Sequence, residues 1–172
     1  MSCQRNIGVN TEEQMIKFYT GDIIPDKNTV FVFGSNPLGI NGNPYKGTGG
    51  AALVAVQNFG VGLHEIMNNC LSSSGSAYGL VTVSAPGMKR SLTKDEIINN
   101  IRILYHTARC LPNKDFKVAY RNTSRCSLNG YTGYEMMEMF LVAGDIPENI
   151  WFSEEWINSY IFKNKFKSVE LI

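Results

Sequence analysis

One apolar run constrains the fold of this chain more than any other feature. The run Val30–Phe33 is β-branched and aromatic, and polar turn residues flank it on both sides. Such a run is typical of a strand that is buried on both faces, as in a parallel sheet covered by helices. We therefore expect a central strand here, with an α/β fold around it.

The residues after this strand are rich in glycine. Gly34, Ser35 and Asn36 end the strand, a long polar loop follows, and Gly47 begins the segment that opens the next helix. The first turn of a helix has N–H groups without intrahelical partners and carries the positive end of the helix dipole. Because glycines lack side chains, an anion can approach such N–H groups closely. The stretch predicts a phosphate-binding loop, although any tight turn uses similar residues.

Strand-like and helix-like segments alternate along the rest of the chain. Beyond the first strand, further strands are predicted over Tyr78–Ser84, Phe116–Tyr120 and Ile150–Phe152. Helical spacing predicts helices over Gly49–Phe59, Leu92–Leu111 and Tyr134–Val142. Thr93 and Glu96 form a capping box at the start of the helix over Leu92–Leu111. Shorter helices are predicted over Asn10–Tyr19, over Leu63–Leu71 and from Ser153 onward. This alternation predicts a three-layer α/β/α sandwich with a mixed, mostly parallel sheet.

Composition narrows the class of protein. The chain has 172 residues, of which 44% are hydrophobic and 18% charged, with a formal net charge of +1. We expect a single domain over residues 1–172, with a core over about 20–162 and a Lys-rich C-terminal tail. Near-neutral charge argues against general nucleic-acid binding. No apolar run is long enough to span a membrane and the first residues lack the apolar core of a signal peptide, so we expect a cytoplasmic protein.

The cysteines indicate no metal site or disulfide framework. Cys3, Cys70, Cys110 and Cys126 are widely spaced and form no CxxC pair. We therefore expect buried or incidental thiols, no bound metal and no cofactor. Nothing in the sequence indicates the oligomeric state.

The order of these motifs resembles that of the macro domain, an α/β/α module that binds ADP-ribose. Its pattern has a Gly-Asp-Ile-Thr turn, a strand that ends in Asn-Ala-Ala-Asn, a glycine-rich loop that opens a helix, and a later Gly-Thr-Gly-x-x-Gly-aromatic loop. The similar segments here are Gly21–Ile23, Phe31–Asn36, Gly49–Ala52 and Asn122–Tyr131. The chain looks most like macro-like proteins of phages and bacteria, over roughly residues 20–145.

The resemblance implies a role for each matching residue. Asp22 would contact the adenine amino group, and Asn36 would contact the distal ribose and be the catalytic residue of any hydrolysis. Tyr131 or Tyr134 would flank the distal ribose. Backbone N–H groups of both loops would hold the diphosphate, so the implied ligand-binding set is Asp22, Gly34, Ser35, Asn36, Gly47, Thr48, Gly49, Gly50, Asn122, Thr123, Ser124, Arg125, Cys126, Gly130, Tyr131 and Tyr134.

The chain also departs from the family pattern. Gly34 and Ser35 stand where the family has alanines, and Arg125 and Cys126 interrupt the second glycine-rich run. Arg121 or Arg125 could pair with phosphate through two guanidinium donors. No Asp, Glu or His lies between Gly34 and Gly62, so a general base is missing from the first loop.

Several functions therefore stay open. The first is binding of ADP-ribose or a related NAD-derived or cyclic nucleotide, by sequestration in phage counter-defence. The alternative is an ADP-ribosyl hydrolase or ADP-ribose 1″-phosphate phosphatase in which Asn36 positions a water molecule. The remaining hypotheses are a dehydrogenase fingerprint, which the long loop before Gly47 disfavours, a thiol enzyme using Cys126 and His106, and an interaction module without a ligand.

Overall fold

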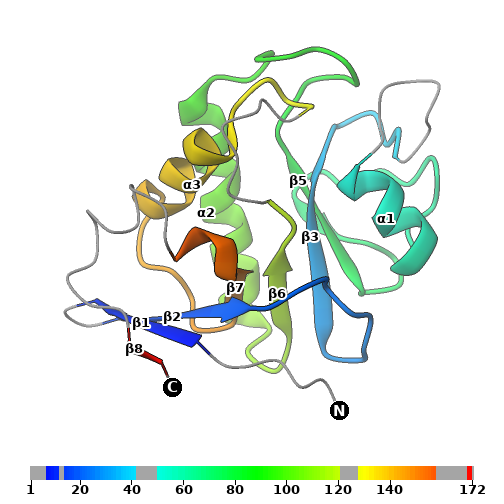
Figure 1. Cartoon of the computed structure of the whole chain (residues 1–172). Coiled ribbons are helices and arrows are strands. Elements are labelled where there is room, and N and C mark those ends of the chain that lie inside the picture. The colour runs from blue at the N-terminus through cyan, green and yellow to red at the C-terminus, as the bar shows by residue number, and fades with distance from the viewer. Residues whose placement is uncertain (1–6, 12–13, 42–49, 121–127, 158–169, 172) are drawn as a thin grey trace.

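The computed structural model of the chain describes residues 7–11, 14–41, 50–120, 128–157 and 170–171. Its main element is one eight-stranded sheet with the order β4-β5-β3-β6-β7-β2-β1-β8. The strands in that order are Cys70–Leu71, Ala77–Val81, Thr29–Ser35, Asp115–Val118, Ile150–Ser153, Gln14–Tyr19, Ile7–Thr11 and Glu170–Leu171. Neighbours from β5 to β2 are parallel, whereas β4, β1 and β8 pair antiparallel (Figure 1). The expected α/β class with a mixed, mostly parallel sheet is confirmed.

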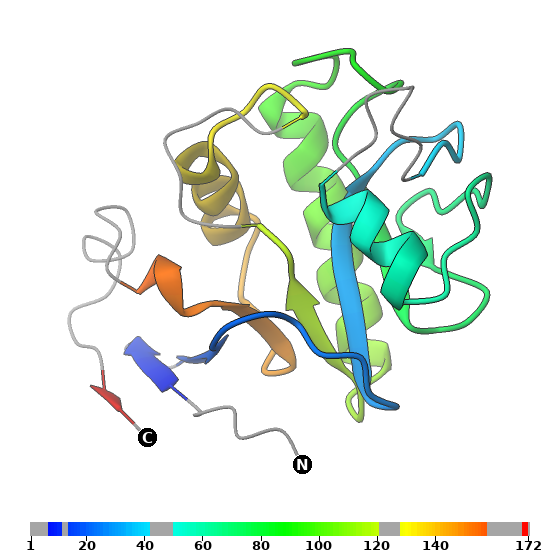
Figure 2. The same cartoon turned by 45° about the vertical axis from the view of Figure 1, so that its right-hand side comes forward.

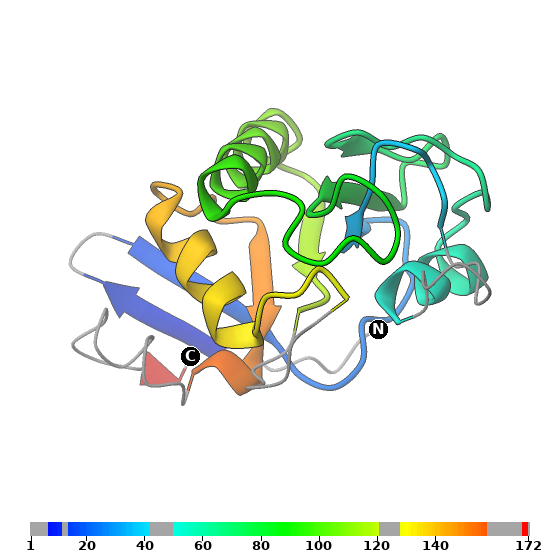
Figure 3. The same ribbon diagram turned by 90° about the horizontal axis from the view of Figure 1, so that it is seen from above.

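Helices pack on both faces of the central strand β3. Phe31 and Phe33 pack with residues of α1 (Ala51–Asn58), whereas Val30 and Val32 pack in the larger core with α2 (Lys94–Cys110) and α3 (Gly133–Val142). Figure 2 shows β3 between α1 and α2, and Figure 3 shows these helices on opposite sides of the strand. Because successive side chains of a strand point to opposite faces, an uninterrupted apolar run supplies apolar side chains to the cores on both sides of the sheet.

Both longer helices begin with the same local device. Thr93 accepts from the Glu96 backbone N–H while Glu96 accepts from the Thr93 backbone N–H, which confirms the predicted capping box of α2. Thr132 and Glu135 make the equivalent pair at the start of α3. Each box satisfies N–H groups that lack partners within the helix.

Aromatic side chains close the core on the side of α3. The Phe152 ring stacks on Trp156 at 4.8 Å between centroids, and Phe140 packs edge-on against Phe152 at 5.5 Å. Trp156 ends a short 3₁₀ helix (Glu154–Trp156) and donates its indole N–H to the Tyr120 carbonyl oxygen at 3.1 Å. This bond joins the 3₁₀ helix to Tyr120, two residues after the end of β6.

Two predicted helices are wrong. Residues predicted as a helix over Asn10–Tyr19 form β1 and β2, because Ile16 and Phe18 are buried with the half-buried Lys17 between them, which is the alternation of a strand. The segment predicted as a helix over Leu63–Leu71 forms turns and then the short strand β4. The carbonyl oxygens of Leu63 and Glu65 in this segment accept from Asn41, and the Glu65 carboxylate accepts from the backbone N–H groups of Gly62 and Ser73.

Among the described residues, no helix is long and apolar enough to cross a membrane. The Lys-rich tail predicted at the C-terminus lies almost entirely outside the described residues.

Candidate functional site

The carboxyl ends of β3, β5 and β6 lie together at one edge of the sheet, which is the upper edge in Figure 1. β3 is the parallel neighbour of both β5 and β6, so the loops that follow these strands start side by side. A Cβ atom added to Gly50, before α1, would lie 3.9 Å from the side chain of Leu128, which belongs to the second glycine-containing segment. The two glycine-containing segments of the sequence thus meet at an edge where sheets of this type bind ligands.

Asn36 organises the loop that follows β3. Its side-chain oxygen accepts from the Leu38 backbone N–H at 3.1 Å, and its side-chain NH₂ donates to the Ile40 carbonyl oxygen at 3.0 Å. The residue itself is buried. In this arrangement the Asn36 amide holds a tight loop in place, as asparagine side chains commonly do in turns.

The loop that follows α1, over residues 62–73, holds the loop after β3 in place. The buried Asn41 donates its backbone N–H to the Leu63 carbonyl oxygen at 3.0 Å and its side-chain NH₂ to the Glu65 carbonyl oxygen at 2.7 Å. The Glu65 carboxylate accepts from the backbone N–H groups of Gly62 and Ser73. Burial by itself would raise the pKa of Glu65, but these hydrogen bonds lower it below its ordinary value. Glu65 is therefore an ionised structural group.

Gly34 lies directly beneath a tyrosine that follows the neighbouring strand β6 by two residues. A Cβ atom at position 34 would lie 2.5 Å from the Tyr120 hydroxyl oxygen and 3.1 Å from the Thr82 hydroxyl oxygen. An approach below 3.0 Å leaves no room for alanine without a shift of the tyrosine. The glycine at position 34 thus makes space for Tyr120.

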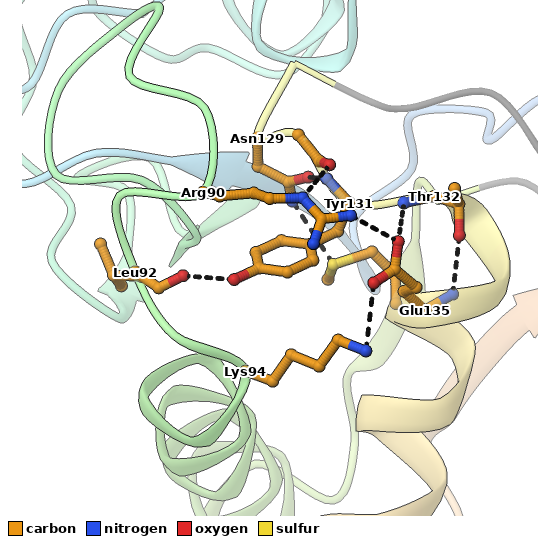
Figure 4. A network of polar contacts seen from close by, with 9 residues as sticks. Arg90, Leu92, Lys94, Asn129, Tyr131, Thr132 and Glu135 are labelled. Atoms are coloured by element: carbon orange, nitrogen blue, oxygen red, sulfur yellow. Dashed lines mark hydrogen bonds and ion pairs between the residues drawn. The ribbon is translucent and has the colours of Figure 1, made fainter.

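A compact polar network fixes the turn that leads into α3 (Figure 4). The Arg90 guanidinium lies 4.7 Å from the Tyr131 ring centroid, and its Nε donates to the Gly130 carbonyl oxygen at 3.0 Å. The buried Tyr131 donates its hydroxyl to the Leu92 carbonyl oxygen at 2.6 Å and its backbone N–H to the Asn129 side chain. Tyr131 therefore joins the turn to the core.

Two cations continue this network to the start of α3. Glu135 accepts from Arg90 and from Lys94, each at 3.1 Å. Burial alone would raise the pKa of Glu135, but the Thr132 backbone N–H and these two cations lower it below its ordinary value. The carboxylate is thus ionised while it caps the helix and joins it to the loop before α2.

The structure describes only part of the predicted set of ligand-binding residues. Gly34, Ser35 and Asn36 lie at the end of β3, and Gly50 lies close to Leu128. Gly130 and Tyr131 lie in the turn before α3 and contact the segment that follows β5, while Tyr134 is exposed on α3 and Asp22 is exposed in the turn after β2. β6 and β7 separate β2 from β3 in the sheet. Gly47, Thr48, Gly49, Asn122, Thr123, Ser124, Arg125 and Cys126 lie outside the described residues.

Three residues of this edge were missed in the sequence. Tyr120 ends one predicted strand, and Thr82 lies near the end of another. The alternation of β6 would have placed Tyr120 on the same face as Phe116 and Val118, but no local signal places its hydroxyl over Gly34. Arg90 precedes a helix start in an ordinary polar loop. Its partners follow about forty residues later, so only tertiary structure identifies them.

The thiol hypothesis receives no new support. His106 lies on α2, where its Nε2 atom is 3.8 Å from the sulfur of Cys110, while Cys126 lies outside the described residues. Cys70 and Cys110 are exposed free thiols. Within the described ranges, no group of three His, Cys, Asp or Glu side chains is arranged to hold a metal ion.

Fold and site together define an α/β protein with a loop-lined edge at the carboxyl ends of its central strands. Comparisons with protein-family models, with curated proteins and with solved structures gave no match to this chain.

Proposed function

We propose that this protein binds ADP-ribose, or a related NAD-derived or cyclic nucleotide, at the carboxyl edge of β3 and β6. The observation that carries the proposal is the parallel pairing of these two strands, which starts both glycine-containing loops at the same edge. Facing backbone N–H groups from two such loops suit a diphosphate. The resemblance of the sequence motifs to the macro domain supports the same choice of ligand.

The start of α1 suits an anion for a separate reason. Its cap residue is Gly50, which has no side chain to accept from the first-turn N–H groups, and its first turn contains no acidic residue. Both α2 and α3, in contrast, begin with a threonine cap and an acidic partner. A phosphate at the start of α1 would satisfy N–H groups that the other two helices satisfy internally, and it would meet the positive end of the helix dipole.

We propose binding, with sequestration as the role, in preference to hydrolysis. The Asn36 amide is already bonded on both sides to its own loop, and the Glu65 carboxylate is bonded to two backbone N–H groups. Hydrolysis needs a group that orients or deprotonates a water molecule. These two side chains instead stabilise loops through their hydrogen bonds, so neither is available to a water molecule in the described structure.

Isothermal titration of the full chain with ADP-ribose tests the proposal. We expect saturable binding of one ligand per chain and, on incubation with ADP-ribose 1″-phosphate, no release of phosphate. Ala51→Asp puts a carboxylate into the first turn of α1, where it favours the helix but repels phosphate. This variant should lose affinity at least tenfold, and thermal unfolding checks that the half-buried position 51 accepts the carboxylate.

Asn58→Asp is the matched control, because it adds the same charge at the exposed far end of the same helix. It should bind ADP-ribose as the unmodified chain does. Equal affinity of both variants would show that the start of α1 does not hold the phosphate, and turnover of the phosphorylated substrate would favour the enzyme.

A further inference from the structure

Three hydroxyl groups in the described structure are buried without a hydrogen-bond partner. They belong to Thr29, Tyr78 and Tyr120. Thr29 begins β3, and the Tyr78 hydroxyl lies beside Thr107 in the last turns of α2, far from the carboxyl edge of the sheet. Only Tyr120 lies at that edge, so only its hydroxyl coincides with the candidate site.

The position of the Tyr120 ring is firmly set. It packs against Phe140 with 6.1 Å between ring centroids, and its carbonyl oxygen accepts from the Trp156 indole. The hydroxyl reaches the space over Gly34, between the ends of β3 and β6, with the Thr82 hydroxyl beside it. The side chains of Thr82 and Asn129 are its polar neighbours and act against the rise in its pKa that burial causes. Neither side chain lies in good hydrogen-bonding geometry with the hydroxyl.

A buried polar group without a partner is rare in folded proteins, because it loses its bonds to water and gains nothing in return. Such a group at a ligand-binding edge has a ready explanation, since a ligand atom can supply the missing partner. The absence of a side chain at Gly34 is what lets the hydroxyl lie at this edge, as any larger residue would collide with it.

We propose that the Tyr120 hydroxyl is a hydrogen-bond donor of the ligand site and that a ribose or phosphate oxygen of the bound nucleotide accepts from it. This inference rests on the proposed function. Burial raises the pKa of Tyr120 to about 12, so the group keeps its proton at neutral pH. A protonated hydroxyl can donate to an ester, hydroxyl or phosphate oxygen, all of which a nucleotide offers.

Tyr120→Phe tests the assignment, because it removes the hydroxyl oxygen and leaves the ring packing in place. If the hydroxyl is unpaired in the free protein, its removal leaves the melting temperature unchanged or raises it. ADP-ribose should then bind five- to twentyfold more weakly. Tyr78→Phe is the matched control, since it removes another unpaired hydroxyl, and it should leave ADP-ribose affinity unchanged.

Two results would overturn the assignment. One is an unchanged affinity of Tyr120→Phe for ADP-ribose when the unmodified chain binds it. The other is a melting temperature that falls by several degrees in Tyr120→Phe but not in Tyr78→Phe, which would mean that Tyr120 has an internal partner. If the unmodified chain gives no heat with ADP-ribose, the proposed function fails, and the Tyr120 assignment to a nucleotide oxygen fails with it.

The stability measurement distinguishes these two failures. It needs no ligand, so it reports whether the hydroxyl is unpaired even when binding is absent. A lack of binding with an unchanged melting temperature points to the wrong ligand, whereas normal binding with a lowered melting temperature points to the wrong role for Tyr120.

Discussion

The contact between Gly34 and Tyr120 predicts a strong coupling between two substitutions. In Gly34→Ala, the added methyl carbon would lie 2.5 Å from the Tyr120 hydroxyl oxygen, so the ring or the strand must move. Overpacking of this kind costs about 1–3 kcal/mol. Replacing glycine by alanine inside a strand stabilises the folded state by about 0.5–1 kcal/mol, because the unfolded chain loses less backbone entropy on folding. We therefore expect Gly34→Ala to lower the free energy of unfolding by about 1–2 kcal/mol.

In the Tyr120→Phe background the collision disappears. The nearest atoms to the new methyl carbon are then the Thr82 hydroxyl oxygen at 3.1 Å and the ring carbon of residue 120 at 3.6 Å. The same Gly34→Ala substitution should then change the free energy of unfolding by less than about 0.5 kcal/mol. The coupling energy of the double-mutant cycle is thus about 1–2 kcal/mol, well within the range measured for residues in contact.

Urea unfolding followed by tryptophan fluorescence measures all four proteins of the cycle. For a chain of this size, a change of 1 kcal/mol shifts the melting temperature by roughly 2–4 °C, so thermal unfolding gives a second readout. Gly79→Ala is the matched control, because its added carbon would lie 2.8 Å from Met67 atoms instead. Its cost should be the same in both backgrounds. An equal cost of Gly34→Ala in both backgrounds would refute the reasoning.

Two further predictions concern the scaffold around the site. The buried Asn149 donates its side-chain NH₂ to the carbonyl oxygens of Ala108, Leu111 and Lys114, at and just beyond the end of α2. Asn149→Ala should therefore lower the free energy of unfolding, measured by urea unfolding, by about 2–3 kcal/mol. A loss below about 0.5 kcal/mol would contradict this role. Because the pKa of Glu135 is lowered in the folded state, its stabilisation is complete above the ordinary value of 4.5 and is lost as the pH falls through the lowered value. The difference in unfolding free energy between the unmodified chain and Glu135→Gln should therefore shrink from about pH 5 to about pH 3, and a constant difference would be inconsistent with this linkage.

Local sequence signals predicted the central part of the fold well. The run that forms β3 needs both faces buried, and the threonine cap of α2 satisfies its own helix end, so both can be recognised without knowing the rest of the chain. β2 was misread because its apolar residues Met15, Ile16, Phe18 and Tyr19 also fit one face of a short helix. The structure places the Lys17 ammonium 5.3 Å from the Trp151 ring centroid, a tertiary contact that no local pattern reports.

The candidate site shows the same division. Its glycines were predicted because backbone geometry and close approach depend on residue type alone. Tyr120 was not predicted as a site residue, since its hydroxyl is placed by Gly34 on the neighbouring strand β3, which is far away in the sequence. Asn36 was predicted to contact a ligand, and the structure adds that its amide holds the loop after β3; a ligand contact stays a prediction.

Backbone amide shifts during a titration with ADP-ribose test the central claim most directly. In ¹⁵N-labelled full-length protein, we expect saturable shifts at the carboxyl edge, in Gly34–Asn41, Gly50–Ala52 and Leu128–Tyr131. Amides of β1 and those around Lys114, beyond the far end of α2, should stay unchanged. Shifts confined to these distant segments, or no shifts at millimolar ADP-ribose, would contradict the assignment of a nucleotide site to this edge.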